Sequence, residues 1–297
     1  MRSIVECIYK HAQNQPDKTA IIAGGESITF GALYSDIKKF RSYLLEQGIE
    51  KGDRVIVKAS HTISYAVLCY GVHAALAALV PVEKNLPAKG AGEIAKNVGA
   101  KMVISDVDPE VEGVKFLDMK EIAPVLEAYA QKAGEIDEFP TDDMTADILF
   151  TTGTTGKSKG VQLSHLSLMT MSKTSIAGTE MEADNVYLVT VPMNHAGGIR
   201  KLHMSMVNGS SIVMLEGLLR LNLFFKYIED YGVTSIYLPP SAVRMVMQLG
   251  GKQLPKYDSQ LRFIYTGSAA YPEGDKEKLC SLLPNVRLYN GYGGSEI

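Results

Sequence analysis

The stretch from Phe150 to Gly160, FTTGTTGKSKG, gathers hydroxyl side chains, glycines and two lysines in one short run. Glycines let backbone N–H groups turn toward an anion, hydroxyls add hydrogen-bond donors, and lysines add positive charge. The stretch therefore predicts a loop that binds phosphate groups. A Walker P-loop is excluded by spacing, because that motif needs a glycine at the position that Thr151 occupies.

A flexible linker is the alternative interpretation of such a composition. The segment before the loop, DILFT at 147–151, has the pattern of a short buried strand, and GVQL at 160–163 resumes an apolar alternation. A loop held between two strands has fixed ends, so phosphate binding is favoured over a tether.

The elements that would position this loop alternate regularly along the chain. A hairpin is expected around Gly24 and Gly25, and an acidic, proline-containing stretch at 135–145 divides the chain. The order predicts an α/β fold with two α/β subdomains, residues 1–140 and 141–297, whose mostly parallel sheets are covered by helices. Helices are expected at 31–47, 64–77 and 88–98, and strands at 54–58, 78–82, 101–105, 147–151, 186–190, 211–215, 234–238, 261–266 and 286–289.

The composition is that of a globular protein that binds small molecules. Of its 297 residues, 46% are hydrophobic and 21% charged, and the formal net charge of -3 gives no reason to expect a nucleic-acid partner. The three cysteines have neither metal-ligand nor disulfide-framework spacing, which fits a reducing compartment, the cytoplasm. Glu6 and Lys10 interrupt the apolar run that a signal peptide would need at the N-terminus.

The uncharged segment 63–82 is about as long as the roughly 20 residues that span a bilayer. It is rich in alanine and glycine, contains His73, and ends on a β-prone pair followed by Pro81. We therefore expect a buried helix that leads into a short strand, and no transmembrane segment.

Three further polar, glycine-rich stretches follow predicted strands: PMNHAGG at 192–198, GSAAYPEG at 267–274 and NGYGGSE at 290–296. Ligands of open parallel sheets collect beyond the carboxyl ends of the strands. The four loops are therefore expected to form one site at one sheet edge. Arg200 and Lys201, which follow the first of these stretches, are expected on a solvated helix face.

These motifs resemble those of the adenylate-forming enzymes, which include acyl-CoA synthetases, firefly luciferase and the adenylation domains of peptide synthetases. FTTGTTGKSKG resembles the signature T-[S/T]-G-T-T-G-x-P-K-G, with Ser158 in place of the proline, and NGYGGSE resembles N-x-Y-G-x-T-E. GSAAYPEG resembles the family's G-[G/S]-A loop, and VPMNHAGG resembles the P-[L/M]-x-H-x-x-G segment of acyl- and aryl-CoA ligases. Weaker matches, ITFGAL at 28–33 and HAALAALVPVEKNLP at 73–87, extend the resemblance over nearly the whole chain.

The resemblance assigns roles to particular residues. His195 would lie beside the acyl pocket, Glu296 would bind magnesium, and Thr151, Lys159, His195 and Glu296 would carry the catalytic roles. The triphosphate of ATP would be bound by Thr151, Thr152, Gly153, Thr154, Thr155, Gly156, Lys157 and Lys159. The adenosine would be bound by Gly267, Ser268, Ala269, Asn290, Gly291, Tyr292 and Gly293, with Ser295 in place of the family's threonine.

The implied function is ATP- and Mg²⁺-dependent activation of a fatty or aromatic carboxylic acid as acyl-AMP, followed in the full-length enzyme by transfer to coenzyme A. Two alternatives stay open: an amino-acid adenylation domain, which would need an acidic residue in its pocket, and a nucleotide- or acyl-AMP-binding protein without turnover. The sequence stops at Ile297, so the family's mobile C-terminal lobe is expected to be absent and activity to be low. The oligomeric state stays open.

Overall fold

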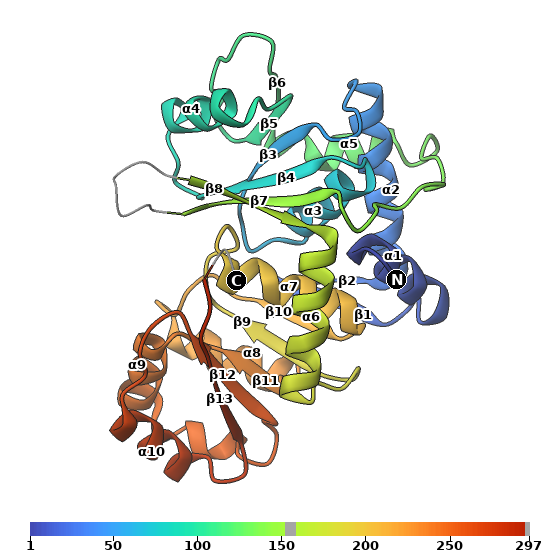
Figure 1. Ribbon diagram of the computed structural model, residues 1–297. Helices are drawn as coiled ribbons and strands as arrows, with labels where there is room; N and C mark the ends of the chain where they lie inside the picture. Colours follow the sequence, from blue (N-terminus) through green and yellow to red (C-terminus); the bar gives the residue numbers. More distant parts are fainter. Residues whose placement is uncertain (152–158, 295–297) are drawn as a thin grey trace.

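The computed structural model describes residues 1–151 and 159–294 (Figure 1). Two short 3-10 helices, Met119–Glu121 and Leu254–Tyr257, accompany the α-helices and strands. The α-helices are α1 (Ile4–Asn14), α2 (Phe30–Glu46), α3 (Ile63–Ala74), α4 (Ala88–Val98), α5 (Ile122–Ala128), α6 (His165–Thr179), α7 (Ala196–Asn208), α8 (Leu221–Asp230), α9 (Pro240–Gly250) and α10 (Glu273–Leu282). The strands are β1 (Thr19–Ala23), β2 (Glu26–Thr29), β3 (Arg54–Lys58), β4 (Ala78–Val82), β5 (Met102–Ser105), β6 (Lys115–Asp118), β7 (Thr145–Thr151), β8 (Lys159–Ser164), β9 (Val186–Val189), β10 (Ser211–Met214), β11 (Ser235–Tyr237), β12 (Phe263–Gly267) and β13 (Arg287–Gly291).

The strands form two sheets, and the α/β prediction is confirmed. We call the sheet with the order β6-β5-β3-β4-β7-β8 the first sheet and that with the order β13-β12-β11-β9-β10-β1-β2 the second sheet. Neighbouring strands pair in parallel except for two hairpins, β1–β2 and β7–β8, each of which ends its sheet with an antiparallel strand. Parallel strands need a covering crossover between them, and helices supply it.

The inner strands are apolar on both faces because both faces are covered. In β10, Ile212 packs into the core between the sheets, whereas Val213 packs into a separate core on the outer face of the second sheet. In β3, Val57 faces the core between the sheets and Ile56 faces α4 on the opposite side. The period of two sends successive side chains to opposite cores, which explains the continuous apolar runs of these strands.

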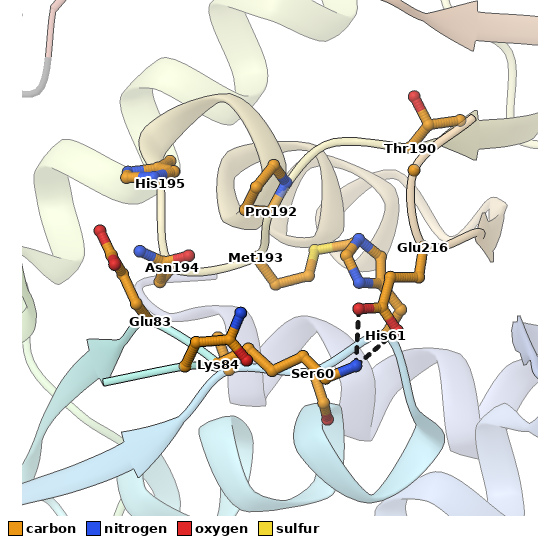
Figure 2. Close-up of a pocket in the computed structure, with 13 residues that line it drawn as sticks. Ser60, His61, Glu83, Lys84, Thr190, Pro192, Met193, Asn194, His195 and Glu216 are labelled. Carbon is orange, nitrogen blue, oxygen red and sulfur yellow. Dashed lines mark hydrogen bonds and ion pairs between the residues drawn. The ribbon is translucent and has the colours of Figure 1, made fainter. Parts of the chain in front are cut away.

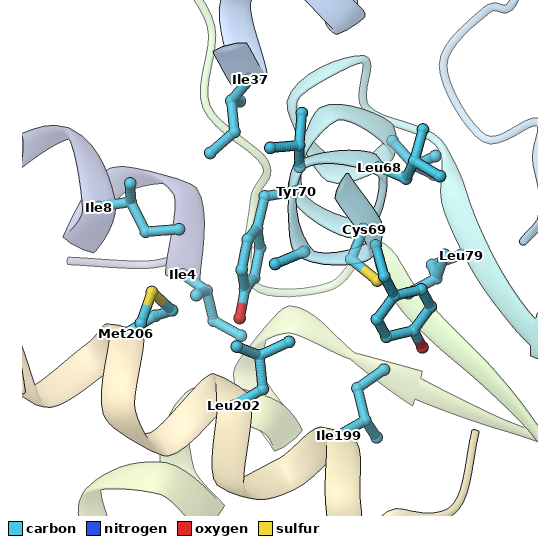
Figure 3. Packing of buried hydrophobic residues seen from close by; sticks show 14 of the residues in the cluster. Ile4, Ile8, Ile37, Leu68, Cys69, Tyr70, Leu79, Ile199, Leu202 and Met206 are labelled. Atoms are coloured by element: carbon cyan, nitrogen blue, oxygen red, sulfur yellow. The ribbon is translucent and has the colours of Figure 1, made fainter. Parts of the chain in front are cut away.

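The molecule therefore has five layers (Figure 1). Helix α4 covers the outer face of the first sheet, and α8, α9 and α10 cover the outer face of the second. Helices α1, α2, α3, α6 and α7 contribute to the core between the sheets. Figure 3 shows this core where Ile4 of α1, Tyr70 of α3 and Leu202 of α7 converge, each with no more than a trace of exposure. One continuous core thus joins both sheets.

The apolar segment 63–82 is confirmed as a buried helix and a strand. Helix α3 is buried on almost every side, because it lies in the layer between the two sheets. Gly71 permits its close packing on α2, since a Cβ there would come within 2.5 Å of the Phe40 ring. None of the helices in the described residues is long and apolar enough to span a membrane.

The two sheets take strands from both sides of residue 140. The hairpin β1–β2, from the start of the chain, ends the second sheet, and β7 and β8, which follow residue 140, end the first sheet. The predicted boundary lies in the segment between α5 and β7. Its role as a division between two folding units stays a prediction, which a fragment experiment tests below.

Candidate functional site

The carboxyl ends of both sheets meet at one cavity of about 420 Å³ (Figure 2). From the first sheet, the segments after β3 and β4 contribute its walls, and from the second, the segments after β9 and β10. The lining residues are Ala59, Ser60, His61, Glu83, Lys84, Asn85, Thr190, Pro192, Met193, Asn194, His195, Glu216 and Gly217. Loops far apart in the sequence are thus brought to one hollow, as expected at the carboxyl ends of parallel strands.

Most of the charge in this cavity is already paired. The Lys84 ammonium donates to both carboxylate oxygens of Glu216 at 2.6 and 2.8 Å, which lowers the pKa of that carboxyl. His61 donates from Nε2 to the Val191 carbonyl at 2.8 Å, and burial lowers the pKa of its imidazole. Its ring is therefore neutral at pH 7. Glu83 is exposed beside them and carries a further negative charge on the wall.

His195 lies at the rim of the cavity, at the N-cap of α7. Its extended backbone (φ −102°, ψ 151°) precedes the helix, and its side chain is exposed. The turn is tight, because a Cβ at Gly198 would lie 2.3 Å from the Pro192 carbonyl oxygen. Glycine is therefore needed there for the PMNHAGG segment to present His195 to the cavity. That this cavity accepts an acyl group stays a prediction.

The predicted phosphate-binding loop connects the two strands of the β7–β8 hairpin. Thr151 ends β7 and pairs in register with Lys159, the first residue of β8, whose side chain is exposed. The remaining residues predicted to contact the triphosphate, Thr152, Gly153, Thr154, Thr155, Gly156 and Lys157, lie outside the described residues.

The expectation that all four loops follow one sheet is wrong. The hairpin belongs to the first sheet, whereas PMNHAGG, GSAAYPEG and NGYGGSE follow β9, β12 and β13 of the second. The strand assignments were sound, but a βαβ pattern does not say which of two sheets a strand joins. The site is therefore expected between the sheets rather than along one edge.

The residues predicted to contact adenosine lie at the adjacent ends of β12 and β13. Gly267 and Gly291 are register partners in this parallel pair. A Cβ at Gly267 would lie 3.0 Å from the Gly291 carbonyl oxygen, and one at Gly291 would collide with the Tyr265 hydroxyl. A side chain at Gly291 would therefore displace the Tyr265 ring, and one at Gly267 would be tightly packed.

Beyond the two strands, the backbone leaves the sheet with unusual geometry. Ser268 has a left-handed backbone (φ 72°), which is costly for a residue with a side chain, and its hydroxyl lies 2.9 Å from that of Tyr237. Ala269 and Asn290 are exposed, and Tyr292 is 99% exposed, so its ring is available to a ligand. Gly293 follows, and Ser295 and Glu296 lie outside the described residues.

The prediction that Arg200 and Lys201 form a solvated helix face is wrong. Lys201 is only 7% exposed, and its ammonium lies 3.8 Å from the centroid of the Tyr265 ring and 5.2 Å from that of Tyr237. Arg200 donates to the Gly294 carbonyl at 2.9 Å and so connects α7 to the segment after β13. This part of the helix packs against the ends of β11 and β12. The sequence pattern of the helix does not reveal that these strands cover it.

Sequence reasoning missed this lysine and the two tyrosines around it. A signal was present: between residues 196 and 208 the helix carries no acidic side chain, and its two adjacent cations stand among apolar and small residues. The sequence analysis also did not predict Glu83 and Glu216 as site residues. Both are distant in sequence from His195 and join it only where the fold forms the cavity.

Comparison with known proteins identifies the family. A family model described as AMP-binding enzyme matches residues 8–297. The chain belongs to the AMP-binding enzyme family. Its curated relatives include acyl-CoA synthetase 7 of Caenorhabditis elegans, 27% identical over 99% of this chain and 60% of that protein. A phenyloxazoline synthase of Mycobacterium sp. (strain MCS) is 26% identical over 97% of this chain and 24% of that protein.

Solved structures share the fold of this AMP-binding enzyme. The structure of VinN with L-aspartate has a TM-score of 0.89 at 17% identity, covering 99% of this chain and 76% of that one. The N-terminal subdomain of Klebsiella oxytoca NpsA has a TM-score of 0.87 at 19% identity, covering 100% of this chain and 74% of that one. The first curated relatives are longer, since this chain spans 53 to 60% of three CoA-ligase and acyl-ligase relatives. The resemblance to adenylate-forming enzymes is therefore confirmed.

Proposed function

We propose that this AMP-binding enzyme activates a carboxylic acid with ATP as an acyl adenylate, and that the complete protein then transfers the acyl group to coenzyme A. The observation that carries the proposal is the cavity at which the carboxyl ends of both sheets meet, with His195 at its rim. The family match supports acid activation, and the motif around His195 supports the CoA-ligase branch. A fatty or aromatic acid is the substrate class that this branch suggests.

In the proposed reaction a carboxylate oxygen attacks the α-phosphorus of ATP, an O–P bond forms, and the bond to pyrophosphate breaks. An ionised carboxylate needs no general base, so the chain has to position two anions and neutralise their charge. Lys159 and Thr151, at the two ends of the hairpin loop, are suited to hold the triphosphate. Gly267, Ser268 and Gly291, at the adjacent ends of β12 and β13, are the residues proposed to contact the adenosine.

Magnesium is proposed as the partner of Glu296 and of the triphosphate, where it would supply positive charge. Glu296 lies outside the described residues, and within the described ones no group of three or more His, Cys, Asp or Glu side chains could hold a metal ion. The binding roles that the described residues support are therefore those toward ATP and the acid.

The test is acid-dependent exchange of pyrophosphate into ATP, measured over a panel of fatty, aromatic and amino acids. Exchange with a fatty or aromatic acid supports the proposal, and its absence with every acid despite ATP binding would mean a nucleotide-binding protein without turnover.

His195→Ala should change the ranking of acids and leave ATP affinity nearly unchanged. A lower melting temperature without a change in ranking would assign His195 a structural role only. Thioester formation with the complete protein and CoA tests the second half-reaction.

Amino-acid adenylation is the second candidate, and one observation favours it. Glu83, an exposed carboxylate on the cavity wall, could hold a substrate ammonium group. Relatives of this chain also include surfactin synthase subunit 2 of Bacillus subtilis (strain 168), 25% identical over 99% of this chain and 8% of that protein. The same panel decides between the two functions. If the chain adenylates amino acids, an amino acid should support faster pyrophosphate exchange than its deaminated analogue.

A further inference from the structure

Lys201 occupies an environment that is unusual for a lysine. Its side chain is buried under the ends of β11 and β12, where the rings of Tyr237 and Tyr265 lie 5.9 Å apart and both face its ammonium. Among the described residues, no carboxylate pairs with it and no acceptor hydrogen-bonds to it. Two aromatic faces offer a cation attraction but no acceptor oxygen.

Nothing else on the helix compensates for this charge. Helix α7 has no acidic residue between Ala196 and Asn208, so no carboxylate on this helix offsets the charge of Lys201. Its neighbour Arg200 is also cationic. Burial, and secondarily the charge of Arg200, lowers the pKa of Lys201 to about 7. An anion bound beside Lys201 would stabilise its charged form and so offset both the burial and the repulsion from Arg200.

The position also fits the proposed site. His195, the N-cap of α7, lies on the rim of the cavity, and Lys201 follows it by six residues, about 9 Å further along the helix axis. Tyr237 lies between α7 and the segment after β12. Its hydroxyl is 2.9 Å from the Ser268 hydroxyl and 2.9 Å from where a Cβ would stand on Gly197. Gly197 therefore lets α7 pack closely against Tyr237, because a side chain at this position would strike the hydroxyl.

We propose that Lys201, whose ammonium lies over the rings of Tyr237 and Tyr265, binds a second acidic group of the substrate. The acid that is activated would then be a dicarboxylic acid or a similar acid with an anionic group at its far end. This inference rests on the proposed function and narrows its substrate class. A nucleotide phosphate is the alternative anion, because Ser268, which is predicted to contact adenosine, lies 2.9 Å from the Tyr237 hydroxyl. The ATP affinity of a Lys201 variant distinguishes the two. We favour the acid, because the helix that carries Lys201 also presents His195 at the rim of the cavity.

The first experiment measures acid binding by isothermal titration in the presence of AMP, which requires no turnover. The panel pairs straight-chain dicarboxylic acids of four to eight carbons with monocarboxylic acids of the same length. We expect at least one diacid to bind on the order of tenfold to a hundredfold more tightly than its matched monoacid, the range typical of a hydrogen bond to a charged group. Pyrophosphate exchange should show the same preference.

The second experiment changes the lysine. Lys201→Met keeps the length of the side chain and removes its charge, and it should abolish the diacid preference while ATP affinity stays within twofold. Lys201→Arg keeps a cation and should retain part of the preference. Lys226→Met is the matched control, because Lys226 is exposed on α8 and pairs with Asp230. Melting curves establish that each variant is folded.

The outcomes separate this inference from the proposed function. Exchange with monoacids, equal binding of both acids and no effect of Lys201→Met would overturn the inference and leave acid activation standing. Loss of ATP binding in Lys201→Met would assign the lysine to the nucleotide and also overturn the inference. Failure of every acid to bind or exchange, with ATP still bound, would reject both. The inference would be established if the parent prefers diacids, Lys201→Met abolishes this preference, and Lys201→Arg and Lys226→Met do not abolish it.

Discussion

At the scale of single residues, a buried cation should be visible in the protein's stability. The pKa of Lys201 is about 7 in the folded state, against 10.5 for an ordinary lysine, because burial disfavours the charged form. Between these two values the unfolded chain binds more protons than the folded one, so the free energy of unfolding rises with pH from 7 to 10.5. Below pH 7 the whole cost of burying the ammonium is present.

Lys201→Met should therefore stabilise the chain most at pH 6 to 7, and the difference from the parent should shrink by up to about 1.4 kcal/mol per pH unit as the pH rises toward 10. Denaturant titrations of both proteins at several pH values measure this difference. Lys226→Met, which removes an exposed charge, should show no comparable trend. A difference that stays constant with pH would contradict the buried-cation argument.

Lys159 is expected to act on the nucleotide rather than on the fold. Its side chain is exposed where the hairpin leaves the loop, so Lys159→Ala should change stability by less than about 0.5 kcal/mol. ATP binding should weaken on the order of tenfold, whereas AMP binding should change little, because AMP lacks the β- and γ-phosphates. Titrations with both nucleotides test this, with Lys173→Ala on α6 as an exposed control. Equal losses for ATP and AMP would refute the assignment.

At the scale of elements, a buried polar cluster joins four segments of the chain. Asp147 of β7 is fully buried, and its two carboxylate oxygens accept hydrogen bonds from Nε2 of His73 on α3 and Nε2 of His203 on α7, each at 2.9 Å. Nδ1 of His203 lies 3.1 Å from the Tyr70 hydroxyl, and the His165 ring of α6 lies 5.0 Å from that of His73. Although burial alone raises the pKa of Asp147, the two histidines hold it below its usual range.

His165 makes this cluster sensitive to acid. Neither of its ring nitrogens has a hydrogen-bond partner in the described protein, and burial lowers its pKa from 6.5 to about 3. The folded state therefore holds a neutral ring that the unfolded chain protonates, so this contribution to stability is complete above pH 6.5 and is lost as the pH falls toward 3.

His165→Phe should accordingly flatten the acid side of the stability curve by up to about 1.4 kcal/mol per pH unit below pH 6.5. At pH 7.5 the variant should be nearly as stable as the parent, because a ring without hydrogen bonds is replaced by one of similar shape. Chemical denaturation between pH 4 and 8 measures the slope. His195→Gln, at an exposed histidine, is the control, and an unchanged slope in His165→Phe would show that this ring is not the group that titrates.

At the scale of the whole molecule, the two sheets are interleaved in sequence. The second sheet depends on β1 and β2 from the start of the chain, and the first sheet on β7 and β8 from after residue 140. The core between them is likewise shared, with Ile4 and Tyr70 from one side of residue 140 and Leu202 from the other (Figure 3). Each half would expose a strand edge and much of this core if it stood alone.

Fragments 1–140 and 141–297 should therefore each lack a cooperative unfolding transition when expressed separately. Expressed together, they should associate and recover one, since the association restores both sheets and the shared core. Circular dichroism melting and size-exclusion chromatography measure these properties. Cooperative melting of either fragment alone would instead show that residue 140 divides two independent folding units.

Much of this fold follows from local patterns. Strand β3 was predicted to the residue, and β9, β10 and β12 to within two residues at either end, because an apolar run bounded by turn residues encodes a strand buried on both faces. The motifs single out the glycines at 198, 267 and 291, and in the structure a side chain at 198 or 291 would strike a neighbour while one at 267 would be tightly packed. The roles of His195 and Lys159 came from the resemblance and stay predictions.

The sequence by itself determined the class of fold, the order of its elements and the family, because these depend on periodicity and on short motifs that are local in the chain. Only the tertiary structure decided which strands share a sheet, which loops meet at the cavity beside His195, and that Lys201 lies against Tyr265 instead of water. The physical reason is that a sequence pattern indicates which face of an element is buried but not which other element covers that face. The partner of a buried face is chosen by contacts between residues far apart in sequence, and the charge of Lys201 acquires its meaning only from those contacts.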